Sequence, residues 1–246
     1  MHNPTTLSLD GLVNFRDLGG ITTAHGTIRP GVLFRSESVS DLSATGRQDL
    51  ASGSIRTVID LRSEAEVQRA PGLATDSLTP RLVALPLLDG AMPTSVTQLP
   101  TLETIYQQLV TESGAAFARA AGTVADAEGG VLIHCTAGKD RTGLAVALTL
   151  LAVGADLDQV RADYIVSSQH LAGAWAERML AGARAHGVEI PDTEAARELI
   201  FGTSQNAFDA AMDRVYEGFG SAQGYLLRHG LLDDQLERLA VRLVES

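Results

Sequence analysis

Cysteine is nearly absent from this sequence: its 246 residues include one, Cys135. A single cysteine excludes an internal disulfide, and it cannot supply the several thiolates of a cysteine-based zinc site. The six histidines have no metal-ligand spacing, so we expect neither a metal nor a cofactor. A lone cysteine is most often a buried apolar side chain, so any other role has to be inferred from its neighbours.

Basic residues and long apolar runs are also scarce. The chain has 19 basic and 30 acidic residues and a net charge of −11, and an acidic surface repels nucleic acids and anionic lipid. The longest apolar stretch, residues 144–153, is too short to cross a bilayer, and the first residues lack the features of a secretory signal. We therefore expect a cytoplasmic protein with no transmembrane segment and no nucleic-acid partner. Export without a signal would leave no trace in a sequence.

Short apolar runs alternate with helical patterns over the first two-thirds of the chain. The apolar runs predict strands at residues 32–34, 55–61, 82–87 and 131–134. The periodicity between them predicts helices at residues 42–50, 102–110, 115–127 and 142–153. Alternation of this kind is typical of an α/β core.

After Gly154 the patterns are all helical. They cover residues 157–166, 171–185, 193–200, 207–219 and 231–244. No linker separates this half from the rest, so we expect one domain over residues 1–246. Its α/β core would span residues 1–154, and residues 155–246 would form either a helical layer on the sheet or a lid over the site.

One stretch, from His134 to Gly143, reads His-Cys-Thr-Ala-Gly-Lys-Asp-Arg-Thr-Gly and lies between a predicted strand and a predicted helix. A tight strand-to-helix turn aims successive main-chain N–H groups into one concavity, and the helix N-terminus adds the positive end of its dipole. Such a nest suits an anion with three equatorial oxygens. The residues expected to bind phosphate are Thr136, Ala137, Gly138, Lys139, Asp140 and Arg141.

The side chains of this stretch suggest a nucleophile and a clamp. Arg141 is a planar fork that can hold two phosphate oxygens at once. The positive field favours the thiolate of Cys135, which can attack phosphorus and form a phosphocysteine. Thr142 can donate a hydrogen bond to the sulfur, and His134 is expected to fix the loop main chain through its ring. Gly138 permits a backbone conformation that a Cβ atom would obstruct.

A Gly-Lys pair in a loop can also indicate a nucleotide-binding P-loop. That motif needs a glycine and a serine or threonine at two positions where this chain has Ile133 and Asp140. Cysteine and arginine separated by five residues, followed by Thr-Gly and framed by a strand and a helix, form a much more specific pattern. The pattern predicts a catalytic phosphate site.

The loop resembles the signature of the cysteine phosphatases, in the form found in the bacterial atypical tyrosine phosphatases. Further motifs match this family at Asn14–Gly20, Leu33–Ser36, Asp60–Ser63, Ala162–Tyr164 and Gly224–Leu226. The resemblance implies a mainly parallel central sheet flanked by helices, no metal, and activity on phosphotyrosine. The resemblance further implies activity on phosphoserine, phosphothreonine and phosphoinositides. In some members of the family, C-terminal helices cover the pocket. The segment 89–102 is shorter here than in the mycobacterial members, so no substrate contact is inferred there.

Expelling a phenolate or alkoxide requires a proton, and an aspartic acid is the usual donor in this chemistry. Asp140 lies inside the loop, and Asp89 follows a predicted strand, where many cysteine phosphatases carry their acid. Arg141 would hold Asp140 ionised, whereas a bound phosphate dianion would oppose this. The resemblance to a branch with its acidic residue inside the loop favours Asp140, with Asp89 as the alternative.

Four functions compete. The first is hydrolysis of phosphotyrosine in proteins, with inorganic phosphate as the product ligand. The second is hydrolysis of phosphoinositides, because the Lys139 ammonium suits a multiply phosphorylated ring. A phosphate-binding module without catalysis is disfavoured by the intact Cys135, Arg141 and Thr142. An arsenate reductase would need further cysteines, which this chain lacks.

Other polar and aromatic residues have structural interpretations. We expect Arg16 and Asp17 to form an ion pair, although the family resemblance equally allows them to line the site. Arg35 and Arg62 are expected to be structural or to support the loop. Trp175 fits a core position, with stacking on a substrate ring as the alternative.

Overall fold

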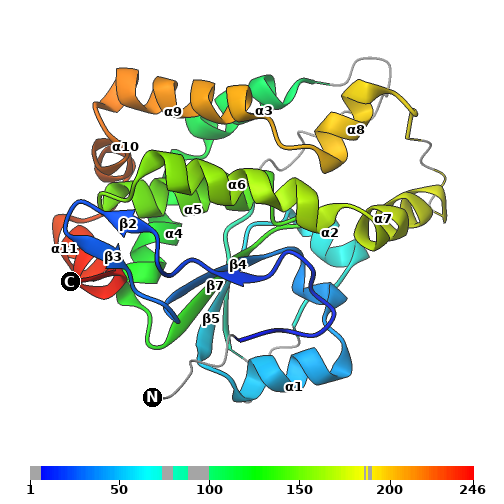
Figure 1. Cartoon of the computed structure of the whole chain (residues 1–246), viewed down its shortest axis with the longest axis horizontal. Coiled ribbons are helices and arrows are strands. Elements are labelled where there is room, and N and C mark those ends of the chain that lie inside the picture. Colours follow the sequence, from blue (N-terminus) through cyan, green and yellow to red (C-terminus); the bar gives the residue numbers. More distant parts are fainter. Residues whose placement is uncertain (1–6, 74–79, 88–99, 186, 188–189) are drawn as a thin grey trace.

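The computed structural model describes residues 7–73, 80–87, 100–185, 187 and 190–246 (Figure 1). Within these residues the central sheet has the strand order β1-β4-β7-β5-β6. Its strands are β1 (Arg16–Asp17), β4 (Leu33–Ser36), β7 (Gly130–His134), β5 (Ile55–Asp60) and β6 (Arg81–Ala84). The pairs β4–β7, β7–β5 and β5–β6 are parallel, and the edge strand β1 is antiparallel to β4. The expected α/β fold with a mainly parallel sheet is confirmed.

Both faces of this sheet are buried at its central strands β4, β7 and β5, in which every residue except Arg56 is buried, as is usual for parallel strands with helices on both sides. Val131 and Ile133 of β7 belong to one hydrophobic cluster and Leu132 to another, as the alternation of side chains along a strand requires. Figure 1 shows α1 on one side of the strands and α4 and α5 on the other. These helices are α1 (Ala44–Ser52), α4 (Gly114–Asp126) and α5 (Asp140–Ala152), and α3 (Leu102–Glu112) packs against α4.

Several element ends differ from the sequence-based expectations. α5 begins at Asp140 instead of Thr142, and β6 ends at Ala84. Ser43 caps α1 by accepting a hydrogen bond from Gly46 N, as serine commonly does at a helix N-terminus. Two short elements, the 3₁₀ helix Val39–Asp41 and α2 (Glu64–Arg69), are not among the expectations, because so few residues show no helical periodicity.

Three short strands form a second, antiparallel sheet: β2 (Thr22–Thr23), β3 (Gly26–Ile28) and β8 (Val244–Glu245). The expectation that the chain is helical to its end is therefore wrong, because α11 (Asp233–Leu243) is followed by β8. Gly26 makes the close pairing possible: its φ is 149°, and a Cβ atom there would lie 2.0 Å from the Glu245 carbonyl oxygen. Strands this short leave no alternation for the sequence to reveal.

The C-terminal half contains helices that complete the core and helices that lie beside it. α6 (Leu157–Leu171), α9 (Gln205–Phe219), α10 (Ala222–Arg228) and α11 pack against α3, α4 and α5 and share their hydrophobic cluster. α7 (Ala174–Ala185) and α8 (Glu194–Phe201) lie at one end of the molecule, on the right of Figure 1. Gly173, with a φ of 74°, separates α6 from α7.

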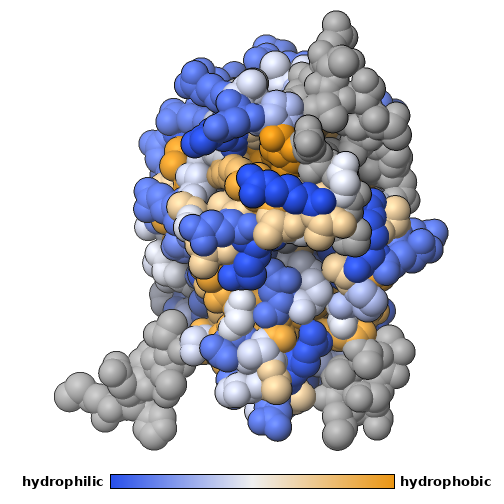
Figure 2. Space-filling model, turned by 90° about the vertical axis from the view of Figure 1, so that its right-hand side faces the viewer, coloured by the Kyte–Doolittle hydropathy of each residue, from blue (hydrophilic) through white to orange (hydrophobic). Residues whose placement is uncertain are grey.

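Figure 2 shows the end of the molecule that carries α7 and α8, where hydrophilic side chains predominate and hydrophobic areas are small. Among the helices of the described residues, none combines the length and the apolar character needed to cross a bilayer.

Candidate active site

Cys135 lies at the carboxyl edge of the parallel sheet, directly after β7. The strand ends at His134 and α5 begins at Asp140, so the strand-to-helix loop is formed as the sequence predicts. We refer to residues 135–141 as the Cys135 loop. Ligand sites of open α/β sheets lie at this edge. Cys135 is buried, with 2% of its surface exposed.

Side chains from the N-terminal region hold the carbonyl oxygens of the Cys135 loop. The Asn14 side-chain amide donates to the carbonyl oxygens of Ala137 (3.0 Å) and Gly138 (3.2 Å). Arg35 Nη2 donates to those of Gly138 (2.8 Å) and Lys139 (3.3 Å). Three successive carbonyl groups are thereby fixed from one side, and the expected support of the loop by Arg35 is confirmed.

The main-chain N–H groups of the loop are left free by this arrangement. In a trans peptide unit the N–H and C=O groups point in opposite directions, and the described residues contain no cis peptide bond. The N–H groups that follow the fixed carbonyls therefore point away from Asn14 and Arg35. None of the N–H groups of residues 136–142 donates to an acceptor in the described part of the chain. Free donors on one side of a loop at a helix N-terminus form an anion-binding nest.

Gly138 is required by this loop conformation. Its φ is 66°, and a Cβ atom there would lie 2.0 Å from the Ser36 carbonyl oxygen. The loop packs against the end of β4 at this point, so no other residue fits without moving main chain. The expectation that Gly138 provides a backbone conformation that a Cβ atom would obstruct is confirmed.

Arg141 is held in one orientation by Glu66 of α2. Its Nη1 and Nη2 atoms donate to Oε2 (2.6 Å) and Oε1 (2.7 Å) of that carboxylate, and the Thr136 hydroxyl donates to Oε1 as well. Burial would raise the pKa of Glu66, but Arg141 and Thr136 outweigh burial and lower that pKa to about 2. Burial also opposes the charge of Arg141, yet Glu66 holds the pKa of the guanidinium above its ordinary value. Arg141 Nε has no acceptor among the described residues, so one edge of the fork remains for a phosphate.

His134 and Thr142 flank the loop and are fully buried. His134 Nδ1 lies 3.3 Å from the Cys135 carbonyl oxygen, as expected for a ring that fixes the main chain, and Nε2 lies 3.7 Å from Oδ2 of Asp60. Burial lowers the pKa of His134 to about 4, although Asp60 acts in the opposite direction, so the ring is neutral at pH 7. Thr142 Oγ1 has no hydrogen-bond partner in the described residues, so the expected bond to the sulfur is not formed in this structure.

The two candidates for the general acid lie in different parts of the chain. Asp140 is the first residue of α5, with 25% of its side chain exposed. It accepts a hydrogen bond of 2.5 Å from the Tyr106 hydroxyl of α3. Asp89 lies outside the described residues.

Lys139, the only lysine in the sequence, is fully buried. Its Nζ atom donates to the carbonyl oxygens of Leu199 (3.1 Å) and Gly202 (2.5 Å) at the C-terminal end of α8. This end of a helix carries partial negative charge, which a cation stabilises. The ammonium is thus engaged by α8, and its expected use for a multiply phosphorylated ring finds no support in this structure.

The expected ion pair between Arg16 and Asp17 is wrong. Arg16 Nε donates to Asp163 Oδ1 (2.5 Å), and Arg35 Nη1 donates to Oδ2 of the same carboxylate (2.5 Å). Asp17 accepts instead from two main-chain N–H groups nearby. Successive side chains of a strand point to opposite faces, which separates the two residues of β1. The two arginines outweigh burial and lower the pKa of Asp163.

Arg62 and Trp175 have the structural roles expected of them. Arg62 Nη2 donates to Asp60 Oδ2 at 2.8 Å, and both side chains are buried. Trp175 is also buried, and its ring meets that of Phe201 edge-on with the centroids 6.3 Å apart. This contact joins α7 to α8.

Three residues of the site are missing from the sequence-based expectations: Asn14, Glu66 and Tyr106. Ser63 and Glu66 form a capping box, a pattern visible in the sequence that places a helix start close to a strand end. Asn14 belongs to a motif that resembles the family, although its amide has no separate signal. Tyr106 has only the spacing of a core residue in a helix.

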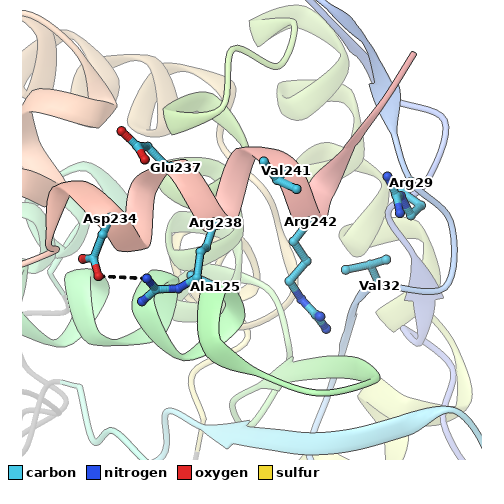
Figure 3. A pocket seen from close by; sticks show the side chains of 8 residues that line it. All are labelled: Arg29, Val32, Ala125, Asp234, Glu237, Arg238, Val241 and Arg242. Atoms are coloured by element: carbon cyan, nitrogen blue, oxygen red, sulfur yellow. Dashed lines mark hydrogen bonds and ion pairs between the residues drawn. The ribbon is translucent and has the colours of Figure 1, made fainter.

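A groove of about 610 Å³ elsewhere on the molecule is unrelated to this site (Figure 3). It lies along α11, and its lining residue Val32 precedes β4, so it is at the end of the sheet opposite to Cys135. Its charged residues include Arg238, which pairs with Asp234 at 2.8 Å. Within the described residues, no three His, Cys, Asp or Glu side chains are grouped to hold a metal ion.

Comparisons with known proteins agree with this geometry. The triple specificity protein phosphatase PtpB of Mycobacterium tuberculosis is 32% identical in an alignment 273 residues long that covers 94% of this chain and 96% of that protein. A putative tyrosine-protein phosphatase of Cupriavidus necator is 33% identical in an alignment 235 residues long that covers 89% of this chain and 82% of that protein. A tyrosine-protein phosphatase of Nostoc commune is 26% identical in an alignment 219 residues long that covers 86% of this chain and 74% of that protein. The sequence model of the tyrosine phosphatase family matches residues 7–245, and the chain therefore belongs to that family.

Proposed function

We propose that this enzyme removes phosphate from phosphotyrosine in proteins, and from phosphoserine and phosphothreonine, through a phosphocysteine at Cys135. The observation that carries the proposal is the set of N–H groups in residues 136–142 that have no acceptor among the described residues; they follow Cys135 and extend into the first turn of α5. Such a nest suits a phosphate group. The name of the mycobacterial relative, a triple specificity protein phosphatase, supports a substrate range wider than phosphotyrosine.

In the first step the Cys135 thiolate attacks phosphorus, and the bond from phosphorus to the leaving oxygen breaks. The loop N–H groups and Arg141 bind the equatorial oxygens, where charge develops in the transition state. Protonated Asp140 donates its proton to the leaving oxygen. The products are the phosphocysteine and a phenol or alcohol.

In the second step water attacks phosphorus and the sulfur–phosphorus bond breaks. Asp140, now ionised, accepts the proton of the water, and inorganic phosphate leaves. The departing thiolate needs a hydrogen-bond donor, and Thr142 Oγ1 is buried with no other partner among the described residues. A buried hydroxyl without a partner is rare, which supports a role for Thr142 at this step.

Phosphoinositides are a weaker proposal. Their main support in the sequence is Lys139, whose ammonium binds carbonyl oxygens of α8 in this structure. A protein substrate needs no second cation beside the loop. We therefore do not propose hydrolysis of phosphoinositides as a second function, and the experiment includes these lipids as alternative substrates.

The test is a phosphate-release panel with phosphotyrosine, phosphoserine and phosphothreonine peptides and phosphoinositides, using wild type and Cys135→Ser. We expect turnover with the phosphopeptides and none with the variant. Rapid acid quenching of the wild type should give a chain heavier by one phosphoryl group, which can lie on sulfur only at Cys135. Residual kcat in Cys135→Ser above about one-hundredth of wild type would contradict the proposed nucleophile, and faster release from phosphoinositides would contradict the proposed substrate class.

A further inference from the structure

A continuous chain of hydrogen bonds runs from the segment between α8 and α9 to the Cys135 loop. Ser204 N donates to the Tyr164 hydroxyl at 3.0 Å, and the hydroxyls of Tyr164 and Tyr106 are 2.8 Å apart. Tyr106 then donates to Oδ1 of Asp140 at 2.5 Å. The two tyrosines come from α6 and α3, and both are buried, with at most 1% of their surface exposed. These hydrogen bonds thus connect Ser204 to a residue of the Cys135 loop through two tyrosines that take no part in the proposed reaction steps.

With Asp140 Oδ1 as the acceptor from Tyr106, the direction of each proton in these hydrogen bonds follows. A main-chain N–H can only donate, so the Tyr164 oxygen accepts from Ser204. The Tyr106 proton is used for Asp140, so Tyr164 must donate its own proton to the Tyr106 oxygen. Burial and the nearby Asp140 raise the pKa of Tyr106 well above its ordinary value, so Tyr106 keeps its proton and remains a donor.

The two oxygens of Asp140 are therefore different. Oδ1 accepts from Tyr106 and lies 3.5 Å from the Lys139 Nζ atom. Oδ2 has no hydrogen-bond partner among the described residues. A hydrogen-bond donor and a positive charge favour negative charge on the atom they contact. A proton on this carboxyl group consequently resides on Oδ2.

Packing prevents the two tyrosines from leaving these positions. The Tyr164 ring stacks on Phe208 with centroids 5.0 Å apart, and it meets the Tyr106 ring edge-on at 6.1 Å. A Cβ atom at Gly143 would lie 2.9 Å from Cδ2 of Tyr164. The glycine that follows Thr142 in the loop motif thus makes room for this ring.

We propose that Tyr106 is the positioning residue for the general acid: it fixes Oδ1 of Asp140, so that Oδ2 alone gives and accepts the proton. Tyr164 orients Tyr106, and Ser204 orients Tyr164. The proposal rests on the proposed role of Asp140 as the acid, and the experiment separates the two.

The decisive variant is Tyr106→Phe, which removes one hydroxyl and keeps the ring. Without this donor Oδ1 of Asp140 is no longer held, and the proton is no longer confined to Oδ2. We therefore expect kcat/KM for phenyl phosphate to fall more than kcat/KM for an aryl phosphate whose leaving group needs no proton. A purely structural role would lower kcat/KM for both substrates by the same factor and leave the ratio of the two values unchanged.

Two further variants serve as controls. Tyr225→Phe removes an equally buried hydroxyl, which donates to the Val110 carbonyl oxygen at 2.7 Å and does not contact the Cys135 loop. It should match Tyr106→Phe in thermal stability and match wild type in the ratio of kcat/KM for the two substrates. Tyr164→Phe removes the donor to Tyr106 and should change this ratio in the same direction by a smaller factor. Equal changes of the ratio in the Tyr225 and Tyr106 variants would overturn the proposal.

Asp140→Asn separates the two levels of the argument. If this variant shows no selective loss with phenyl phosphate, Asp140 is not the acid and the positioning role fails with it. If Asp140→Asn shows the loss but Tyr106→Phe leaves the ratio of kcat/KM for the two substrates unchanged, Asp140 remains the acid and the positioning role alone is wrong. In the double variant the Tyr106 change should have no further effect on the substrate ratio.

Discussion

At the scale of single residues, the role of phosphate clamp proposed for Arg141 depends on both the charge and the orientation of its guanidinium. Two nitrogens of Arg141 donate hydrogen bonds to the Glu66 carboxylate, at 2.6 and 2.7 Å, and Nε has no acceptor among the described residues. The carboxylate therefore fixes the plane of the guanidinium and selects the edge that is available to substrate. A planar fork held at one end is pre-organised for two phosphate oxygens.

Arg141→Lys should lose most activity although the charge is kept. Lysine is a point charge that cannot make the two-pronged contact, and the loss of one such transition-state interaction costs on the order of 10³-fold in kcat/KM. Steady-state kinetics with a phosphotyrosine peptide would measure this. Arg47→Lys, on the exposed face of α1, is the control and should match wild type. Near-normal kcat/KM in Arg141→Lys would remove Arg141 from the role of clamp.

Glu66→Gln should weaken catalysis less than the change at Arg141. An amide offers one acceptor oxygen and no charge, so one of the two bonds to Arg141 is lost, and a hydrogen bond to a charged group is worth about 2 kcal/mol, or about 30-fold in kcat/KM. Glu64→Gln neutralises an exposed carboxylate in the same helix and should leave kcat/KM unchanged. A similar loss in both variants would show that only the charge of α2 matters.

At the scale of elements, the loop and α8 are joined through one ammonium group. Lys139 precedes α5 and binds carbonyl oxygens at the end of α8, 60 and 63 residues further along the chain. Within the described residues, α8 also contacts α7 through Trp175 and Phe201. The position of this helix pair therefore depends on a residue of the Cys135 loop.

Lys139→Met should loosen α8. Methionine is also unbranched, but it leaves the C-terminal end of α8 without a cation. The interaction of a cation with a helix end is worth up to about 2 kcal/mol in a buried setting. We expect main-chain hydrogen exchange in α8 to accelerate on the order of tenfold while α9 is unaffected.

The matched control is Arg197→Met, because Arg197 forms an exposed ion pair with Asp192 beside the same helix. Exposed pairs contribute little, so exchange in α8 should remain close to that of wild type. Lys139 is the only lysine, so an amine-reactive reagent gives a second measurement. Labelling of native Lys139 as fast as in the unfolded chain would contradict the burial of the ammonium.

At the scale of the whole molecule, burial of an imidazole makes stability depend on pH. His134 is fully buried, and its pKa falls from 6.5 to about 4 on folding. Between pH 6.5 and about pH 4, His134 therefore carries a proton in the unfolded chain but not in the folded chain. The stabilisation that comes from the neutral His134 is therefore fully present above pH 6.5, and it is lost as the pH falls toward 4.

We expect the free energy of unfolding to fall by about 2 kcal/mol between pH 7 and pH 5 from this residue alone. Urea denaturation at the two pH values would measure the loss. His134→Asn should be less stable at pH 7 but show a smaller decrease on acidification. The lowered pKa values of Glu66 and Asp163 act at lower pH, so they do not mimic this effect. Equal decreases in wild type and variant would contradict it.

Much of the fold follows from local patterns, and the rest depends on pairing. Runs of β-branched residues identify β5 and β7, and each has a boundary within one residue of the expected one. β2, β3 and β8 are too short to carry a pattern, and β8 exists because β3 provides a partner for residues 244–245. The ends of strands and the shortest elements are set by their neighbours in space.

The sequence by itself determined the local conformation of the Cys135 loop, on which its proposed chemistry depends. Cys135, Gly138 and Arg141 lie within seven consecutive residues between a strand and a helix, and the geometry of that turn follows from local conformation. Such a segment creates a nest of N–H groups wherever the strand ends, because the donors belong to the segment itself.

Only the tertiary structure decided which partners hold the charged groups of this loop. Arg141 meets Glu66 across 75 residues, and Asp140 meets Tyr106 across 34. The ammonium of Lys139 binds α8 and not a substrate in this structure. A side chain of opposite charge or a hydroxyl occurs at many positions of any sequence, and packing of the helices selects the one that lies within hydrogen-bonding distance. The identity of the reacting groups is therefore a local property, whereas their orientation depends on contacts between distant segments.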